Sequence, residues 1–154
     1  MNEKMPATTV PEDLLQTSVL EDPYAKEVQL DIWQHERKKT MYSILAVGLI
    51  LLISNLVAFA TANILDGDHL MDVLLIPIII FGLAGFSMLQ PMVSAISLIV
   101  VILTVTVINY ISLGPASLIL GWLYKVFALY FIIKAVQHAK DAESAKRKLA
   151  VLSE

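Results

Sequence analysis

The feature that most constrains the fold of this chain is a run of 52 residues without a charged side chain, from Val73 to Tyr124. An α-helix rises 1.5 Å per residue, so this run would be roughly 78 Å long as a single helix. Roughly 20 helical residues cross the hydrocarbon core of a bilayer, so a helix of that length fits no membrane. The run must therefore turn back on itself.

A second uncharged run, Thr40 to Leu65, has 26 residues and is long enough to cross a bilayer once. The two runs explain why 57% of the residues are hydrophobic, against about 45–50% in soluble domains. Backbone that faces lipid must satisfy its own hydrogen bonds, so both runs are expected to be helical.

Two signals divide the long run into helices. Gln90-Pro91 is the one plausible turn inside it, because proline suits the first position of a helix. Gly114-Pro115 supplies a second break. The sequence therefore predicts four spans, at about residues 40–64, 70–89, 92–113 and 116–135.

The placement of lysine and arginine predicts the topology. The loops at 66–69 and 114–115 hold neither residue, whereas the segments before the first span and after the fourth are rich in both. The positive-inside rule then places both termini in the cytoplasm, which requires an even number of crossings. Two crossings with a re-entrant hairpin at 73–113 would satisfy the same rule, but each arm of that hairpin is long enough to span.

The segments that flank the spans are polar. Residues 1–21 are acidic and are expected to form a disordered cytoplasmic tail. Residues 22–39 predict a juxtamembrane helix that starts at Asp22-Pro23 and carries Tyr24, Val28 and Ile32 as an apolar stripe. We expect this helix either to lie on the membrane surface or to run on into the first span.

A cytoplasmic helical extension is predicted at residues 136–154. It carries a narrow apolar stripe at steps of three and four residues, formed by Ala135, Ala139, Ala142, Ala145, Leu149 and Leu152. This stripe could pack on the helix at 24–36 or on a partner. The predicted fold is an all-α integral membrane protein. Four transmembrane helices at 40–135 form an antiparallel up-down bundle with cytoplasmic amphipathic helices at both ends, and a plasma (inner) membrane is favoured over an organelle.

Lys125 is the candidate functional charge inside the bilayer. It lies ten residues after Pro115, so roughly 15 Å along the fourth span and near the midplane. A charge there costs from about 2.5 to 10 kcal/mol or more, which makes such a residue a functional candidate. Its partners could be Thr104, Thr106 or Asn55. Snorkelling to a phosphate, or a carboxylate from a partner chain, are the alternatives.

Basic side chains also gather where the spans meet the cytoplasm, and we call them the basic collar: Arg37, Lys38, Lys39 and Lys134, with His138 and Lys140 nearby. Such groups snorkel to lipid headgroups and attract anionic lipid by about 1 kcal/mol each. Their role in setting the topology is enough to explain them.

Small and amide side chains mark expected packing faces, inside the bundle or between protomers. The candidates are Ser54, Ala58 and Ala62 on the first span, Gly82 and Gly85 on the second, and Ser94 and Ser97 on the third. Amides in lipid usually bond across helices, which gives Asn55, Asn63 and Asn109 a structural role.

No catalytic or metal chemistry is expected. Gly85-Phe86-Ser87 lacks the final glycine of a serine-nucleophile motif, and no histidine lies within a span. The acids and histidine near the outer loop are better explained as helix caps than as metal ligands; they are Asp66, Asp68, His69 and Asp72. We therefore expect neither an enzyme nor a cofactor.

The sequence favours a small accessory, assembly or regulatory subunit that acts through helix–helix binding. Its expected partners are the lipid bilayer and either another protein or further copies of the chain, without nucleic acid. The alternative is a small oligomeric transporter or channel with Lys125 on its pathway.

Overall fold

A computed structural model of the chain describes residues 23–62, 67–115 and 122–152, apart from the side chains of 23, 59, 61–62, 67–73 and 112–113. These residues form four helices and no strand: α2 (Pro23–Ala62), α3 (Gly67–Phe86), α4 (Pro91–Leu113) and α6 (Trp122–Val151). The prediction of an all-helical fold is confirmed. The predicted tail at 1–21 lies outside the described residues.

Helix α2 is continuous over 40 residues, so the juxtamembrane segment and the first apolar run form a single element. Of the two arrangements expected for residues 22–39, the structure has the one in which the helix runs on. No glycine or proline interrupts the chain between Pro23 and Gly48. The hydroxyl of Thr40 also donates to the Glu36 carbonyl oxygen at 2.9 Å, across the point where a bend was possible.

The turn between α3 and α4 includes the predicted Gln90-Pro91 pair, because α4 begins at Pro91 with Gln90 as its N-terminal flanking residue. The turn starts earlier than predicted, since α3 ends at Phe86 and the second span was expected to reach about residue 89. Helix α4 stops before Gly114, which has a φ of +69° and donates its N–H to the Tyr110 carbonyl oxygen at 2.9 Å. Glycine adopts positive φ without a steric penalty, so the Gly114-Pro115 break also lies where the sequence predicted it.

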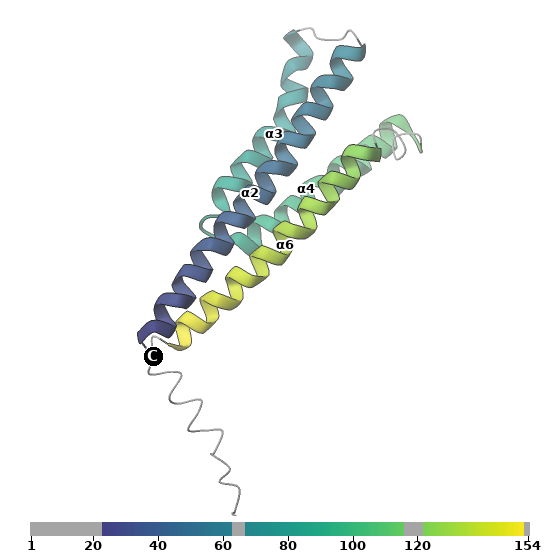
Figure 1. Ribbon diagram of the computed structural model, residues 1–154. Coiled ribbons are helices and arrows are strands. Elements are labelled where there is room, and N and C mark those ends of the chain that lie inside the picture. Colours follow the sequence, from purple (N-terminus) through teal and green to yellow (C-terminus); the bar gives the residue numbers. More distant parts are fainter. Residues whose placement is uncertain (1–22, 63–66, 116–121, 153–154) are drawn as a thin grey trace, which may run out of the picture.

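The N-terminal part of α2 and the C-terminal part of α6 lie side by side, and the two helices diverge beyond this region (Figure 1). The alanine-rich stripe of α6 forms this seam, with buried alanines at 135, 139, 142 and 145. The sequence left open whether the stripe packs within the chain or on a partner, and the structure packs it on α2. Alanine has no side chain beyond Cβ, so it lets two helices approach closely.

The two pairs α2–α3 and α4–α6 diverge with distance from the α3–α4 turn (Figure 1). We call the part near the turn the closed end (residues 33–48, 80–98 and 132–147). We call the other part the open end (residues 49–62, 67–79, 99–113 and 122–131). The closed end holds most of the buried side chains that the structure describes: Thr40, Ser43, Ile44, Val47, Ile80, Ala84, Ser87, Ser94, Ala95, Leu98, Ile132, Ala135, Ala139, Ala142 and Ala145.

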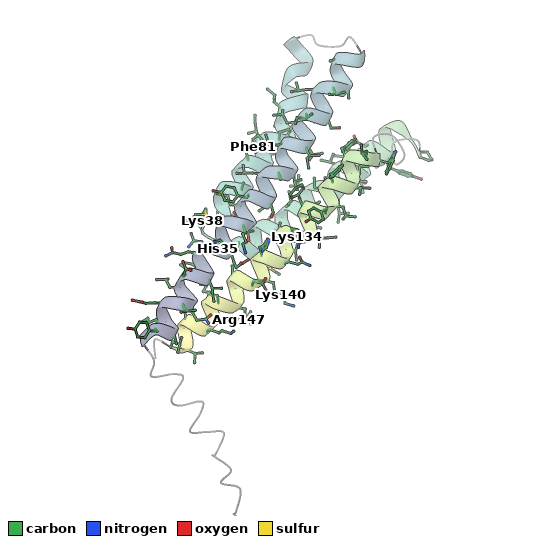
Figure 2. All side chains as sticks on the ribbon, viewed as in Figure 1. His35, Lys38, Phe81, Lys134, Lys140 and Arg147 are labelled. Atoms are coloured by element: carbon green, nitrogen blue, oxygen red, sulfur yellow. The ribbon has the colours of Figure 1, made fainter. Side chains whose placement is uncertain are left out.

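Helix α2 packs closely against α3 at Gly48. A Cβ atom added there would lie 2.6 Å from a ring carbon of Phe81 and 3.2 Å from Ile80; Figure 2 labels Phe81 on α3. The absence of a side chain at Gly48 therefore fixes how closely these helices pack.

Two of the described helices are long and apolar enough to cross a membrane, within the windows Tyr24–Ala58 and Pro91–Ile111. A shorter apolar stretch, Leu74–Phe86, lies in α3. Only 22% of each long window is buried inside the molecule. The core helix of a soluble protein is mostly buried, so this outward-facing apolar surface favours contact with lipid.

Candidate functional site

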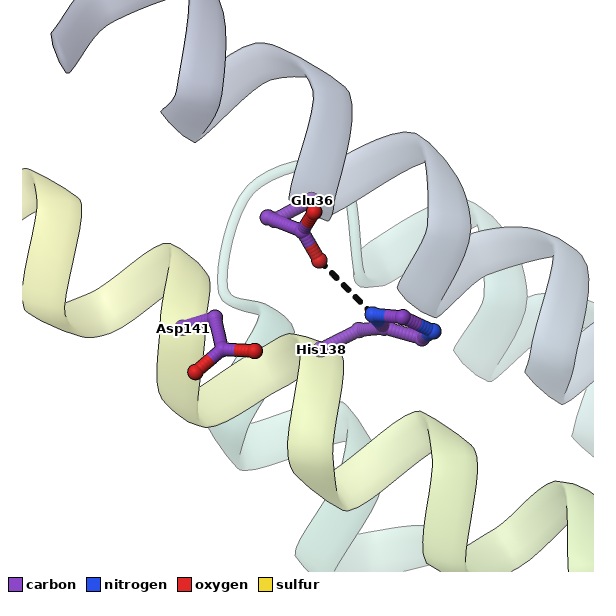
Figure 3. Close-up of side chains that lie close together, drawn as sticks. All are labelled: Glu36, His138 and Asp141. Atoms are coloured by element: carbon purple, nitrogen blue, oxygen red, sulfur yellow. Dashed lines mark hydrogen bonds and ion pairs between the residues drawn. The ribbon is translucent and has the colours of Figure 1, made fainter.

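Three side chains with metal-ligand chemistry meet where α2 crosses α6 (Figure 3). Glu36 comes from α2, and its Oε2 lies 2.7 Å from Nδ1 of His138 on α6. Asp141 follows His138 by three residues, which places both on one face of the helix. One ligand atom from each of the three residues lies within 4.8 Å of the other two. We call this group the interhelix cluster.

Both oxygens of the Glu36 carboxylate are engaged. Lys39 donates from Nζ to Oε1 at 2.7 Å, while His138 contacts Oε2. Burial acts to raise the pKa of Glu36, but the hydrogen bonds and charges of Lys39 and His138 outweigh burial and hold that pKa below its ordinary value of 4.5. Glu36 is therefore ionised at neutral pH.

We expected His138 to lie beside the basic collar and predicted no role for Glu36 or Asp141. Part of the cluster could have been predicted from the sequence, because His138 and Asp141 are three residues apart and so lie on one face of a helix. Glu36 lies 102 residues from His138 along the chain, and no local pattern links residues so far apart. The cluster exists because α2 and α6 pack together.

The members of the basic collar have separate contacts. The Arg37 guanidinium lies 4.3 Å from the ring centroid of Trp33, and its buried Nε has no hydrogen-bond partner among the described residues. Lys38 is exposed. Lys134 lies 6.0 Å from the ring centroid of Tyr130. Figure 2 labels Lys38 on α2 and Lys134 on α6.

Lys125 is half-buried and lines a cavity of about 300 Å³ between the four helices. Asn55, Thr106 and Asn109 line the same cavity. The Nζ atom of Lys125 also lies 5.8 Å from the ring centroid of Tyr124. The structure therefore brings Lys125 together with two of its three predicted neighbours, Asn55 and Thr106.

Thr104, the third predicted neighbour, does not line this cavity. It is exposed, and its hydroxyl donates to the Val100 carbonyl oxygen at 2.9 Å. The hydroxyl of Thr106 likewise donates to the Ile102 carbonyl oxygen at 2.8 Å. Both threonine hydroxyl groups thus donate to backbone carbonyl oxygens of α4 itself.

The small residues of the first span border open space. Ser54 and Ala58 line a cleft of about 610 Å³ between the open ends of α2 and α6, opposite Leu123 and Phe127. The side chain of Ala62 lies outside the described residues. Ser54 and Ala58 of the predicted ladder therefore form part of one wall of this cleft.

Gly82 and Gly85 make no close contact with another helix of the chain. The sequence left open whether they mark packing faces inside the bundle or between protomers, and a Cβ atom added at either glycine would meet nothing within 4 Å. The reason is the rotation of α3, which turns Ile80, Ala84 and Ser87 toward the core and leaves the two glycines exposed. A contact through these glycines between protomers stays a prediction. Ser94, in contrast, is buried, and its hydroxyl donates to the Gln90 carbonyl oxygen at 3.1 Å.

The acids and histidine predicted near the outer loop lie outside the described residues: Asp66 and the side chains of Asp68, His69 and Asp72. The expected role of the acids as helix caps stays a prediction. Asn63 also lies outside the described residues, so its expected structural role is likewise still a prediction.

No protein-family model matches this chain, and no curated protein or solved structure matches it either.

Proposed function

We propose that this chain is a small membrane subunit that acts by binding helices of a partner. In this proposal it crosses a plasma (inner) membrane four times with both termini in the cytoplasm, and it serves an accessory, assembly or regulatory role. The observation that carries the proposal is an exposed apolar stripe on the N-terminal part of α2.

This stripe consists of Tyr24, Val28 and Ile32, which are 73%, 53% and 40% exposed. Their four-residue spacing places them along one side of the helix. The seam with α6 uses another side of α2, on which Gln29, Trp33 and Glu36 are partly buried. The alanine stripe of α6 therefore leaves the apolar stripe of α2 available for a further contact.

The stripe lies on the part of α2 that precedes the first apolar run. If α2 enters the membrane near Thr40, the 17 residues from Pro23 to Lys39 extend roughly 25 Å beyond it. An apolar stripe on a helix in water is a common binding surface for another amphipathic helix. This arrangement supports a cytoplasmic docking surface for a partner helix rather than a helix that lies flat on lipid.

The four crossings rest on run lengths and on the placement of lysine and arginine. The outward-facing apolar windows of α2 and α4 support them. The chain has no cysteine, so single introduced cysteines can report sidedness. We expect Gly67→Cys to react with an impermeant maleimide from outside intact cells and Ser144→Cys to react only after permeabilisation. Labelling of both from the same side would contradict four crossings.

The stripe can be tested by charge substitution. We expect the full chain, purified gently at native abundance, to carry a protein partner or further copies of itself. Val28→Asp combined with Ile32→Asp should abolish this association, because each carboxylate would have to be desolvated in the interface. Gln34→Asp is the matched control, since Gln34 is an exposed polar residue of the same helix. A monomer in the parent sample, or equal association of the double variant, would contradict the proposal.

A second candidate function is a small oligomeric transporter or channel, and the cavity beside Lys125 is the observation that favours it. An ionisable residue inside a bilayer commonly marks an ion or substrate pathway. Lys125→Met should then abolish flux in proteoliposomes while Lys134→Met preserves it. Unchanged flux of every ion tried in Lys125→Met would rule out this pathway.

A further inference from the structure

We propose that Glu36, His138 and Asp141 form a binding site for one divalent transition-metal ion of the Zn²⁺ class, which bridges α2 and α6. This site lies at the closed end of the bundle. It is separate from the exposed stripe of α2 and from the cavity beside Lys125, so it does not depend on either proposed function.

The geometry suits a single ion. Zn²⁺ binds histidine nitrogen and carboxylate oxygen at about 2.0–2.2 Å, so its ligand atoms lie roughly 3.5 Å apart in a tetrahedral site. The three ligand atoms here already lie within 4.8 Å of one another. The Oε2–Nδ1 separation of 2.7 Å would have to open slightly while Asp141 moves closer, which side-chain rotation can supply because Asp141 is exposed.

The donor set selects the class of ion. One imidazole nitrogen with two carboxylates suits Zn²⁺, Mn²⁺ or Fe²⁺, whereas Mg²⁺ and Ca²⁺ prefer sites made entirely of oxygen. Three protein ligands leave room for water to complete the coordination.

The local charge also admits a dication. Glu36 and Asp141 bring two negative charges, and Lys39 contributes one positive charge at 2.7 Å from Glu36 Oε1. Binding through Oε2 would leave Oε1 to Lys39. The Lys39 hydrogen bond would then hold the orientation of the liganding carboxylate, as outer partners of metal ligands commonly do.

A metal ion would compete with the hydrogen bond between Glu36 and His138 for the same two atoms. Without metal, the Nδ1 of His138 contacts Glu36 directly. A metal ion requires the imidazole to bind through a nitrogen without a proton, so metal binding at Nδ1 would displace the hydrogen bond between His138 and Glu36. The ion would thus replace a hydrogen bond between α2 and α6 with two coordinate bonds from α6 and one from α2.

The test is a Zn²⁺ titration of the full chain in phosphatidylcholine nanodiscs by calorimetry, with the absorption of added Co²⁺ as a second readout. We expect one ion per chain and a Co²⁺ spectrum that depends on His138. His138→Ala and Asp141→Asn should each weaken binding by about tenfold or more, which is comparable to the loss when a metal site loses a supporting group. Asp141 is exposed, so Asp141→Asn tests the site without removing a buried contact.

His35→Ala is the matched control, because His35 is an exposed histidine of α2 outside the cluster; it is labelled in Figure 2. This variant should bind Zn²⁺ as the parent does. Absence of saturable binding at one ion per chain would overturn the proposal. Equal affinity in Asp141→Asn and the parent, or an unchanged Co²⁺ spectrum in His138→Ala, would overturn it as well.

Discussion

The closed and open ends of the helical bundle are built from different residues and pack differently. At the closed end, the contacting surfaces consist largely of alanine, serine and threonine with a few larger side chains such as Ile44 and Leu98. At the open end, eight of the nine residues from Leu103 to Ile111 of α4 are exposed. Two cavities of about 610 and 300 Å³ lie between the helices there, whereas the closed end has one of about 350 Å³ beside the α3–α4 turn.

The difference shows how side-chain size sets the spacing of helices in this molecule. Helices surrounded by lipid associate through van der Waals packing, which small residues improve because they let the backbones approach. Gly48 and Ala135 provide such contacts at the closed end. Large side chains such as Leu123 and Phe127 line the cleft at the open end. The Glu36–His138 pair also joins α2 to α6 at the closed end.

The largest expected effect of a single substitution is at Gly48. Gly48→Leu places a side chain where even a Cβ atom would meet Phe81 at 2.6 Å, so we expect a loss of about 3 kcal/mol in the free energy of unfolding. Thermal unfolding in detergent measures it. Gly82→Leu is the control, since the space around Gly82 is open, and it should change stability by no more than about 0.5 kcal/mol. Equal losses in both variants would show that α2 and α3 do not meet at Gly48.

The next effect separates the two ends directly. Ala135 is fully buried at the closed end, whereas Ala58 faces the cleft at the open end. Ala135→Leu should therefore destabilise the protein by about 2 kcal/mol, while the cleft accommodates Ala58→Leu with a change of about 0.5 kcal/mol or less. Denaturant unfolding of the two variants measures the contrast. Similar losses would mean that the open end is packed as tightly as the closed end.

A smaller effect is expected from the ion pairs of Glu36. Glu36→Gln weakens charge-assisted hydrogen bonds with Lys39 and His138 and should cost about 1.5 kcal/mol at neutral pH. Glu143→Gln is the control, because the Arg147–Glu143 distance is 3.9 Å and Arg147 is exposed. Its effect should stay within about 0.5 kcal/mol.

The contribution of Glu36 depends on pH with a defined sign. Its pKa is lower in the folded protein than the ordinary value of 4.5, so its stabilisation is complete above that value and is lost as the pH falls through the lowered pKa. The stability difference between the parent and Glu36→Gln should therefore shrink as the pH falls below 4.5. Unfolding measured along a pH series tests this, and a difference that persists unchanged at low pH would contradict it.

The smallest contrast concerns two hydroxyl groups. The Ser87 hydroxyl donates to the Ala84 carbonyl oxygen at 2.6 Å and is buried at the closed end. Ser87→Ala should cost about 1 kcal/mol, the usual contribution of one such hydrogen bond. Thr104→Val removes an exposed hydroxyl of the open end and should cost less than about 0.5 kcal/mol. Thermal unfolding of the two variants measures both losses. A larger loss in Thr104→Val than in Ser87→Ala would show that the Thr104 hydroxyl has a partner outside α4.

Some features of the site could have been predicted and others could not. The spacing of His138 and Asp141 is visible in the sequence, as is the alanine stripe that packs on α2. The position of Glu36 opposite His138 could not be predicted, because it depends on the rotation of both helices and on which two helices are neighbours. The same holds for Gly82 and Gly85, whose small size allowed contacts inside the bundle that the rotation of α3 does not make.

The sequence by itself determined where α2 and α4 begin and where α4 ends. Proline at positions 23 and 91 and glycine at 114 act on the backbone of their own neighbours, so local residues were sufficient to predict these boundaries. Only the tertiary structure decided that α2 pairs with α6, that Gly48 meets Phe81, and that Glu36, His138 and Asp141 come together. Those contacts join residues far apart in the chain, and their geometry depends on how the small and large side chains of all four helices fit together.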